Sequence, residues 1–383
     1  MLYSLNLQHF RSHENLSVDF AESCTLVVGP NASGKTSIIE AIHLLATGQS
    51  FRAGKVGEMV KFEDEWARIT AVIRADTDQL SQTAQNEADE QTDQAEETEL
   101  SVLLTRGILQ GKKTQHKHFS INGVRRQAKK MLSQLQTTVF RPEDMRIIEG
   151  SPTRRRKFLD EVIASFDAEY LRSLHTYEQS LRRYNKLLEQ VRERRQPITI
   201  LEYWERSIVK HGEYLQQQRE TFLRATKHVS FSVRFQVTYQ PSVVTEANID
   251  AHQERAIAAG HCLIGPHKDD FSVACDVQDL WRGDLTDFHD VALYGSRGQQ
   301  RLAVLWLKAC QLDYIEAQTQ QKPVLLLDDI FSELDAENRD VVLGLIKNHQ
   351  AIITSADQLA IGMLPKKTVV VELPAELVDK SHR

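Results

Sequence analysis

The chain has 383 residues, of which 41% are hydrophobic and 26% are charged, and its formal net charge at pH 7 is −6. This length suffices for two or three domains with a sizeable core, and the composition is that of a globular protein. No apolar run in the sequence approaches a membrane span, and the first residues lack the apolar core of a signal peptide. The four cysteines form no C-x-x-C pair, which is typical of reduced core residues in a cytoplasmic protein.

Charge is distributed unevenly along the chain. Residues 101–230 contain 26 Lys and Arg against 14 Asp and Glu, so this span carries +12 and the rest of the chain −18. Such an asymmetry indicates an anionic partner, although a charge-rich helical face is more often simply solvated. Residues 76–99 contain nine acidic residues and no Lys or Arg, which predicts a disordered insertion in a hairpin loop. We assign no chemistry to this insertion.

The segment from residue 29 to residue 36 reads G-P-N-A-S-G-K-T and fits the phosphate-binding template G-x-x-x-x-G-K-[ST] at every fixed position. The apolar run before it predicts a buried strand at 25–28, and the spacing after it predicts a helix that Gly48 ends. Inward backbone N–H groups and the helix N-terminus then form an anion site. We expect the whole loop to bind a nucleotide: Gly29, Pro30, Asn31, Ala32, Ser33, Gly34, Lys35 and Thr36. Lys35 is expected to act catalytically on the β- and γ-phosphates, and Thr36 to ligate Mg²⁺.

Shorter strands and a turn follow this loop. Residues 66–74 alternate like a strand, and Asn122-Gly123 is a hairpin signal. Residues 154–157 read Arg-Arg-Arg-Lys in the first turn of a predicted helix, where the helix dipole disfavours cations. An external anion bound there is therefore a reasonable hypothesis.

Two apolar heptad stripes, at 170–191 and 201–215, are separated by Pro197. They predict an antiparallel helical hairpin with arms of roughly 40 Å. The stripe residues are expected to be core, so only the charged faces of these helices are candidates for function. Alternation at 231–239 predicts a return to sheet. A polar turn at 265–270 contains His267, which is either structural or in contact with nucleotide or DNA.

The apolar run 323–327 ends in Asp328 and Asp329. Central strands of parallel sheets look like this, and ligands gather at the carboxyl ends of such strands. We expect Asp328 to hold the Mg²⁺ shell, because hard cations prefer oxygen ligands. Asp329 is the candidate to orient or deprotonate the attacking water.

Upstream of this run, Ser296, Gly298 and Gln299 precede a helix with periodic apolar residues, which makes a second anion site. One chain cannot easily wrap both anion sites around one ATP. In the ATP-binding cassette superfamily, which these motifs resemble, the signature helix of one subunit caps the γ-phosphate that its partner holds. Ser296, Gly298 and Gln299 are therefore expected to contact the ATP of a second copy. Residues 331–335 resemble the D-loop of that superfamily.

Together, these segments resemble the RecF family of bacterial DNA replication and repair proteins. The resemblance covers nearly the whole chain and lies in 29–36, 40–41, 50–52, 142–144, 154–160, 265–270, 298–301 and 325–329. It implies an α/β fold: a P-loop ATPase head of ABC/SMC type with a helical hairpin as second lobe. The expected boundaries are 1–152 and 261–383 for the two parts of the ATPase lobe and 153–260 for the helical arm.

The resemblance also implies a function. Such a protein dimerises on ATP, binds DNA at single-strand/double-strand junctions and acts with RecR and RecO to promote RecA loading, with slow, DNA-stimulated ATP hydrolysis. The chain departs from the family pattern in its acidic insertion and in Lys268, which stands where Arg is expected. A switch histidine is missing at 353–357, and the loop 142–144 is the candidate replacement for a Q-loop.

Three other classes of protein fit the motifs less well. The ATPase subunit of a transporter would need a membrane partner, for which the sequence shows no coupling signature. An SMC-type structural protein would have a coiled-coil arm several times longer. A nuclease would need a second carboxylate or histidine metal cluster, which is not evident in the sequence.

Overall fold

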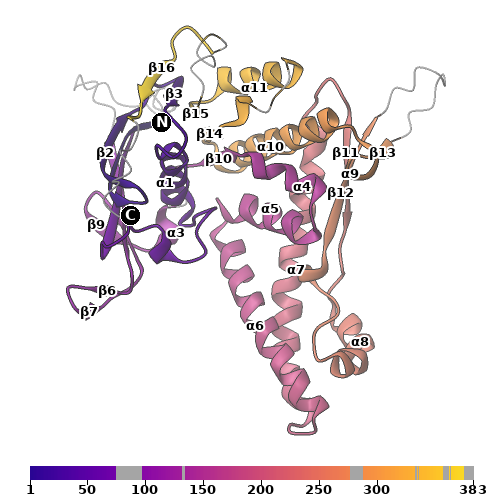
Figure 1. Ribbon diagram of the computed structural model, residues 1–383. Helices are drawn as coiled ribbons and strands as arrows, with labels where there is room; N and C mark the ends of the chain where they lie inside the picture. Colours follow the sequence, from indigo (N-terminus) through magenta and orange to yellow (C-terminus); the bar gives the residue numbers. More distant parts are fainter. Residues whose placement is uncertain are drawn as a thin grey trace, which may run out of the picture. The chain divides into compact units, whose positions relative to one another are not determined.

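The computed structural model describes residues 1–74, 97–131, 134–276, 288–332, 334, 336–356, 362 and 364–374. The chain divides into two compact units (Figure 1). Unit 1 comprises Met1–Pro142 and Thr319–Arg383, and unit 2 comprises Glu143–Gln318. The predicted acidic insertion lies outside the described residues, except that Glu97 to Glu99 begin a strand.

Unit 1 contains a six-stranded antiparallel sheet of order β2-β1-β4-β5-β8-β9. Its strands are β1 (Leu2–Phe10), β2 (His13–Asp19), β4 (Trp66–Arg74), β5 (Glu97–Thr105), β8 (Lys117–Ile121) and β9 (Val124–Arg126). The predicted hairpin turn is confirmed, because Asn122 and Gly123 join β8 to β9 with φ of 50° and 73°, both positive as a type I′ turn requires. A short hairpin of β6 (Ile108–Leu109) and β7 (Lys112–Lys113) lies between β5 and β8 in the chain.

The second sheet of unit 1 is parallel and has the order β10-β14-β15-β3-β16. Its strands are β3 (Cys24–Val28), β10 (Thr137–Phe140), β14 (Val324–Asp328), β15 (Ala351–Ser355) and β16 (Val369–Glu372). Every residue of β3 and β14 is buried, so the predicted buried strands on either side of the nucleotide motifs are confirmed. Strands from the N-terminal and the C-terminal parts of the chain therefore lie side by side in one sheet.

Helix α1 (Lys35–Thr47) contacts strands of both sheets and fills the core between them. Ten of its 13 residues are buried, which explains why its apolar residues extend around the helix instead of following one stripe. It ends as predicted at Gly48, whose φ is 71° and whose N–H donates to the Leu44 carbonyl. The unit also contains α3 (Ala128–Met131) and α11 (Ala336–Asn348).

Unit 2 is built around the predicted helical hairpin of α6 (Ala168–Arg192) and α7 (Glu202–Ala225). Its polar pairs run in opposite directions along the two helices, Asp167 with Tyr214, Ser180 with Ser207 and Tyr184 with Glu205, so the hairpin is antiparallel. Helix α6 has 25 residues and is about 38 Å long. Most stripe residues belong to the core, as expected: Tyr170, Tyr177, Tyr184, Leu201, Ile208 and Leu215 are buried, and others such as Leu174, Leu181 and Trp204 are partly buried against it.

The remaining elements of unit 2 surround this hairpin. They are α4 (Arg146–Glu149), α5 (Pro152–Ala164), α8 (Glu246–Ala259), α9 (Val291–Tyr294), α10 (Arg297–Thr319), and the antiparallel strands β11 (Phe235–Gln240), β12 (Asp270–Asp276) and β13 (Phe288–Asp290). The unit extends beyond the expected arm of 153–260. The reason is that β12 pairs with β11, and α10 shares one apolar core with α5, α6 and α7.

All four cysteines are buried and free, as their spacing predicts. Among the described residues, no helix combines the length and apolarity that crossing a membrane requires.

Candidate nucleotide-binding site

The phosphate loop has the tight curl that its glycines predict. Gly34 stands at the N-terminus of α1 with φ of 89°, and a Cβ there would lie 2.2 Å from His13 Nε2. A Cβ on Gly29 would lie 2.6 Å from Ser33 Oγ. Ala32 also adopts a left-handed conformation, with φ of 68°. Side chains at the two glycine positions would therefore clash, whereas the bare backbone can approach an anion closely.

The side chain of Lys35 is buried and folds over this loop. Its Nζ donates to the carbonyls of Gly29 at 2.7 Å and Pro30 at 2.8 Å. Burial lowers the pKa of Lys35, and the carboxylates of Asp329 and Asp328 oppose that shift. Ser33 Oγ is buried beside it and has no partner among the described atoms. The loop thus contains a cation and an unpaired hydroxyl, a chemistry that suits phosphate oxygens.

The metal residues predicted from sequence lie next to each other. Thr36 Oγ1 donates to Asp328 Oδ1 at 2.9 Å, although 292 positions separate the two residues. Asp328 Oδ1 also accepts from Thr354 Oγ1 at 2.8 Å. A hydroxyl and a carboxylate are hard oxygen donors that fit Mg²⁺, which takes one or two protein ligands beside water and phosphate. No group of three or more His, Cys, Asp and Glu that could hold a metal occurs in the described part of the chain, so a cage made of protein ligands alone is not found there.

Asp329 follows in a left-handed conformation with φ of 51°. Its N–H donates to the Thr354 carbonyl and hydroxyl, at 3.2 and 3.1 Å. A non-glycine residue in this conformation is strained by about 1–3 kcal/mol, and such strain clusters at functional sites. Thr354 lies in the segment where the sequence lacks a switch histidine, and nothing in the sequence pattern pointed to it.

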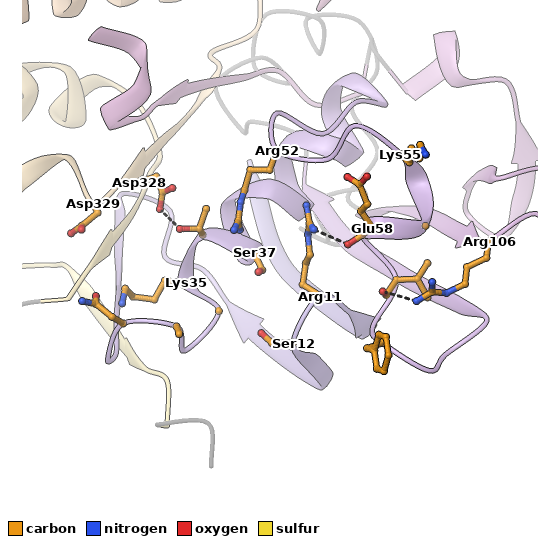
Figure 2. A pocket seen from close by; sticks show the side chains of 17 residues that line it. Arg11, Ser12, Lys35, Ser37, Arg52, Lys55, Glu58, Arg106, Asp328 and Asp329 are labelled. Carbon is orange, nitrogen blue, oxygen red and sulfur yellow. Dashed lines mark hydrogen bonds between the residues drawn. The ribbon is translucent and has the colours of Figure 1, made fainter. Parts of the chain in front are cut away.

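Several of these residues line one cavity of about 860 Å³ in unit 1 (Figure 2). Its wall includes Asn31, Ala32, Gly34, Lys35, Thr36, Asp328 and Asp329 from the predicted motifs. It also includes Arg11, Ser12, Ser37, Arg52, Lys55, Gly57, Glu58, Val60, Phe62 and Arg106. Four segments of unit 1 thus bring five cations around one cavity. This is the environment that a nucleoside triphosphate requires.

Comparison with known proteins agrees with this geometry. The family model for the RecF/RecN/SMC N-terminal domain matches residues 1–372. The chain is 30% identical to "DNA replication and repair protein RecF" of Lachnoclostridium phytofermentans, covering 92% of this chain and 91% of that protein. It is 32% identical to the RecF of Roseiflexus castenholzii, with 92% of each chain covered. The chain belongs to the RecF family.

Solved RecF structures show the same fold. One, described as the recombination mediator protein RecF-ATPrS in the RecFOR pathway, has a TM-score of 0.79 at 26% identity, over 97% of this chain and 96% of that one. A second, described as RecF-ATP in the same pathway, has a TM-score of 0.75 at 27% identity, over 93% and 92% of the two chains. The predicted α/β head of ABC/SMC type with a helical second lobe is thereby confirmed.

Within this RecF-family cavity, Arg11 is held in place by a buried carboxylate. Its Nε and Nη2 donate to the two oxygens of Glu40, at 2.9 and 2.6 Å, and its Nη1 donates to the Glu58 carbonyl at 2.6 Å. The Glu40 side chain is fully buried and also accepts a hydrogen bond from Ser50 Oγ. The sequence motifs did not single out Arg11 for a role. The residues that line the cavity together with Arg11 come from segments far apart in the sequence, so no periodic pattern in the sequence predicts that they meet.

The signature residues belong to unit 2, so they are absent from the lining of the cavity in unit 1. Ser296 Oγ accepts from the Gln299 N–H at 3.3 Å, and Gln299 Oε1 accepts from the Ser296 N–H at 2.8 Å. This reciprocal pair is a capping box at the start of α10. Gly298 lies within its first turn, and Ser296 is exposed. Ser296 and Gln299 therefore satisfy two backbone N–H groups at the start of α10 by themselves. The Ser296 side chain remains exposed to solvent.

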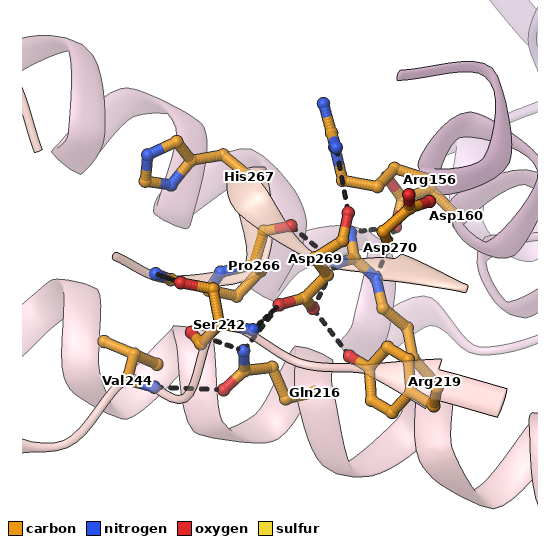
Figure 3. Close-up of polar contacts among 12 residues, drawn as sticks. Arg156, Asp160, Gln216, Arg219, Ser242, Val244, Pro266, His267, Asp269 and Asp270 are labelled. Atoms are coloured by element: carbon orange, nitrogen blue, oxygen red, sulfur yellow. Dashed lines mark hydrogen bonds and ion pairs between the residues drawn. The ribbon is translucent and has the colours of Figure 1, made fainter. Parts of the chain in front are cut away.

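The turn at 265–270 is structural in this protein (Figure 3). Its Asp269 is fully buried and accepts from Arg219, Gln216 and Tyr239. Tyr177 O–H donates to His267 Nδ1 at 2.7 Å, and His267 Nε2 lies 3.3 Å from the Cys262 carbonyl. Burial lowers the pKa of His267 to about 4. Both ring nitrogens are thus used inside unit 2, which favours the structural alternative for this histidine.

The basic turn of α5 is also largely used within unit 2. Arg155 forms a bidentate pair with Asp270, and Arg156 donates to the Asp269 carbonyl. Lys157 Nζ forms an ion pair with Glu161 Oε1 at 3.4 Å. The unfavourable helix dipole at this position is therefore offset by internal acceptors. Of the four cations, Arg154 is exposed and makes no ion pair in the described chain, so the hypothesis of an external anion rests on that residue alone.

Proposed function

We propose that this chain is an ATP-switched DNA-binding protein of recombinational repair and replication, with slow ATP hydrolysis. The observation that carries this proposal is the convergence of Lys35, Thr36, Asp328 and Asp329 on one cavity. The named relatives support the repair context, because they are RecF proteins and one solved relative is described with ATP. From the same family context we also propose that the protein binds junction DNA, acts with RecO and RecR, and promotes RecA loading.

The positions of the side chains support the proposed catalytic roles. The loop from Gly29 to Thr36 binds the phosphates, and the ammonium of Lys35 exchanges its two carbonyl acceptors for phosphate oxygens. Thr36 and Asp328 would hold Mg²⁺, which neutralises charge on the β- and γ-oxygens when bound. Asp329 orients or deprotonates the attacking water. Its side chain is one methylene shorter than the glutamate usual in transporters, which supports slow turnover.

A second copy completes the site in this proposal. Ser296, Gly298 and Gln299 at the start of α10 cap the γ-phosphate held by the other protomer. The neighbouring Leu293 and Tyr294 are 75% and 74% exposed. Large apolar side chains exposed side by side are typical of a surface that a partner covers. ATP would then drive dimerisation, and hydrolysis would release it.

Sizing by light scattering with ATP, with ADP and without nucleotide tests this proposal. We expect dimers only with ATP, and monomers for Lys35→Ala, which loses phosphate binding, and for Ser296→Arg, which blocks the cap. Thr221→Arg is the matched control, since Thr221 is also an exposed helical hydroxyl with a local hydrogen bond. A Ser296→Arg protein that dimerises normally with ATP would remove the shared site and leave a plain nucleotide binder.

The ATPase subunit of a transporter is the second candidate, as is an SMC-like structural ATPase. The helical hairpin of about 38 Å is short for an SMC arm. Stimulation of ATP hydrolysis by DNA, compared with stimulation by lipid vesicles, distinguishes DNA repair from transport. We expect stimulation by DNA alone.

A further inference from the structure

Within the basic span 101–230, the excess positive charge lies mostly in the part that belongs to unit 1. Residues 101–142 contain nine Lys and Arg and no Asp or Glu, whereas residues 143–230 contain 17 Lys and Arg and 14 Asp and Glu. The span of +12 therefore divides into +9 in unit 1 and +3 in unit 2. In unit 2, Arg155, Arg156 and Arg219 are also satisfied by Asp269 and Asp270. The charged helical faces of unit 2, which the sequence suggested as candidates for function, therefore carry little of the excess positive charge of residues 101–230.

Four of these nine cations lie at one edge of the six-stranded sheet. Strand β9 is the edge strand, and its Arg125 and Arg126 are exposed. Lys112 and Lys113 are exposed on the β6–β7 hairpin, which projects from the same part of the unit (Figure 1). Arg125 Nη2 donates to Gln115 Oε1 at 2.6 Å, and this bond ties β9 to the base of the hairpin. We call these four cations the basic edge.

The basic edge has no internal use in the described part of the chain. None of its four cations forms an ion pair with a described carboxylate, and the Gln115 bond is the one side-chain hydrogen bond that Arg125 makes there. Lys117 behaves differently, because its Nζ is half-buried and donates to the Gly48 carbonyl at the end of α1. Cations on an edge strand can also serve to prevent strand pairing between molecules. That role applies to all four cations, because β7 is also an edge strand of its own two-stranded sheet, and a loss of duplex affinity separates it from DNA binding.

The surroundings of the basic edge indicate the kind of anion it fits. Between residues 101 and 142 the aromatic side chains are Phe119 and Phe140, and both are buried. Unpaired bases are usually bound by stacking on exposed aromatic rings, and the segment 101–142 offers none. Lysine and arginine side chains alone bind the regularly spaced phosphates of a duplex. We propose that the basic edge binds the phosphate backbone of duplex DNA.

This inference rests on the proposed DNA-binding function and places a duplex contact on unit 1 instead of on the helical hairpin of unit 2. The test uses the full chain with ATP, Mg²⁺ and a fluorescein-labelled blunt duplex, and measures anisotropy over a series of salt concentrations. The basic-edge variant combines Lys112→Gln, Lys113→Gln, Arg125→Gln and Arg126→Gln. The matched control combines Arg182→Gln, Arg183→Gln, Arg194→Gln and Arg195→Gln, four exposed cations of the helical hairpin. ATP binding by each protein is measured separately with a fluorescent analogue.

We expect the basic-edge variant to bind ATP normally and to lose at least tenfold in duplex affinity. The slope of log affinity against log salt should become shallower by about three to four, since each phosphate contact contributes about 0.9. The control should keep the slope of the unmodified protein. An unchanged slope in the basic-edge variant overturns the inference, and so does aggregation of the variant without loss of duplex binding, which would assign the edge to protection from strand pairing. If the unmodified protein binds no duplex, the proposed DNA-binding function fails together with the inference.

Discussion

Replacing Glu40 by Gln probes how the cavity orients its arginine. Glu40 is fully buried, whereas the side chain of Arg11 is 19% exposed. Breaking a buried ion pair by removing one partner typically costs 3–5 kcal/mol. Because Arg11 retains partial exposure and its bond to the Glu58 carbonyl, we expect about 3 kcal/mol, the lower end of that range. The amide that replaces the carboxylate would also point N–H groups at the guanidinium.

The same change should weaken ATP binding. Arg11 lines the cavity, and a charge-assisted hydrogen bond contributes about 1.5–3 kcal/mol. At about 1.4 kcal/mol for each factor of ten, an Arg11 that no longer points into the cavity raises the dissociation constant of ATP about 10- to 100-fold. Isothermal titration measures this constant under conditions where the variant remains folded, and urea unfolding measures its stability.

Two further variants make this reasoning refutable. Glu220→Gln removes an exposed carboxylate paired with Arg224, and we expect less than about 1 kcal/mol of destabilisation and unchanged ATP affinity. Arg11→Met combined with Glu40→Gln should cost less than the sum of the single changes, since the two side chains act on each other. A Glu40→Gln protein that is destabilised but binds ATP normally would assign Glu40 a purely structural role. Unchanged stability would refute the argument from burial.

Three other outcomes are expected. Asp329→Asn should keep ATP-dependent dimerisation but lower the rate of hydrolysis about 10²- to 10⁴-fold, measured by phosphate release, because it removes the base and leaves Thr36 and Asp328 in place. Arg219→Met should destabilise the protein by about 3–5 kcal/mol in urea unfolding, because it leaves Asp269 buried without its cation; a loss below about 1 kcal/mol would contradict this. His267 has a folded pKa of about 4, below the usual 6.5, so the unfolded chain takes up the proton first. The free energy of unfolding should therefore fall by up to about 3 kcal/mol as pH falls from 6.5 to 4. His267→Gln should remove that part of the pH dependence. If both proteins lose the same stability over this pH range, the prediction is wrong.

The sequence by itself determined those parts of the protein that local rules control. The strand, loop and helix around Gly34, the buried strand that ends at Asp328 and the turn at Asn122-Gly123 all depend on spacing and backbone preferences within a few residues. The two helices of unit 2 could be predicted in the same way, because their apolar stripes repeat along each helix. The pairing of Thr36 with Asp328 was also accessible, since the carboxyl ends of parallel strands meet at one sheet edge.

Only the tertiary structure decided what depends on contacts between distant segments. It pairs Arg11 with Glu40, and it places Thr354 against Asp328 and Asp329. It turns His267 into an internal hydrogen-bonding residue, because the turn packs against α6. It also divides one basic stretch of sequence between two units, and it places four cations of the more basic part at a sheet edge. Side-chain partners and solvent exposure are properties of packing, and no periodicity in the sequence encodes which distant side chain lies opposite.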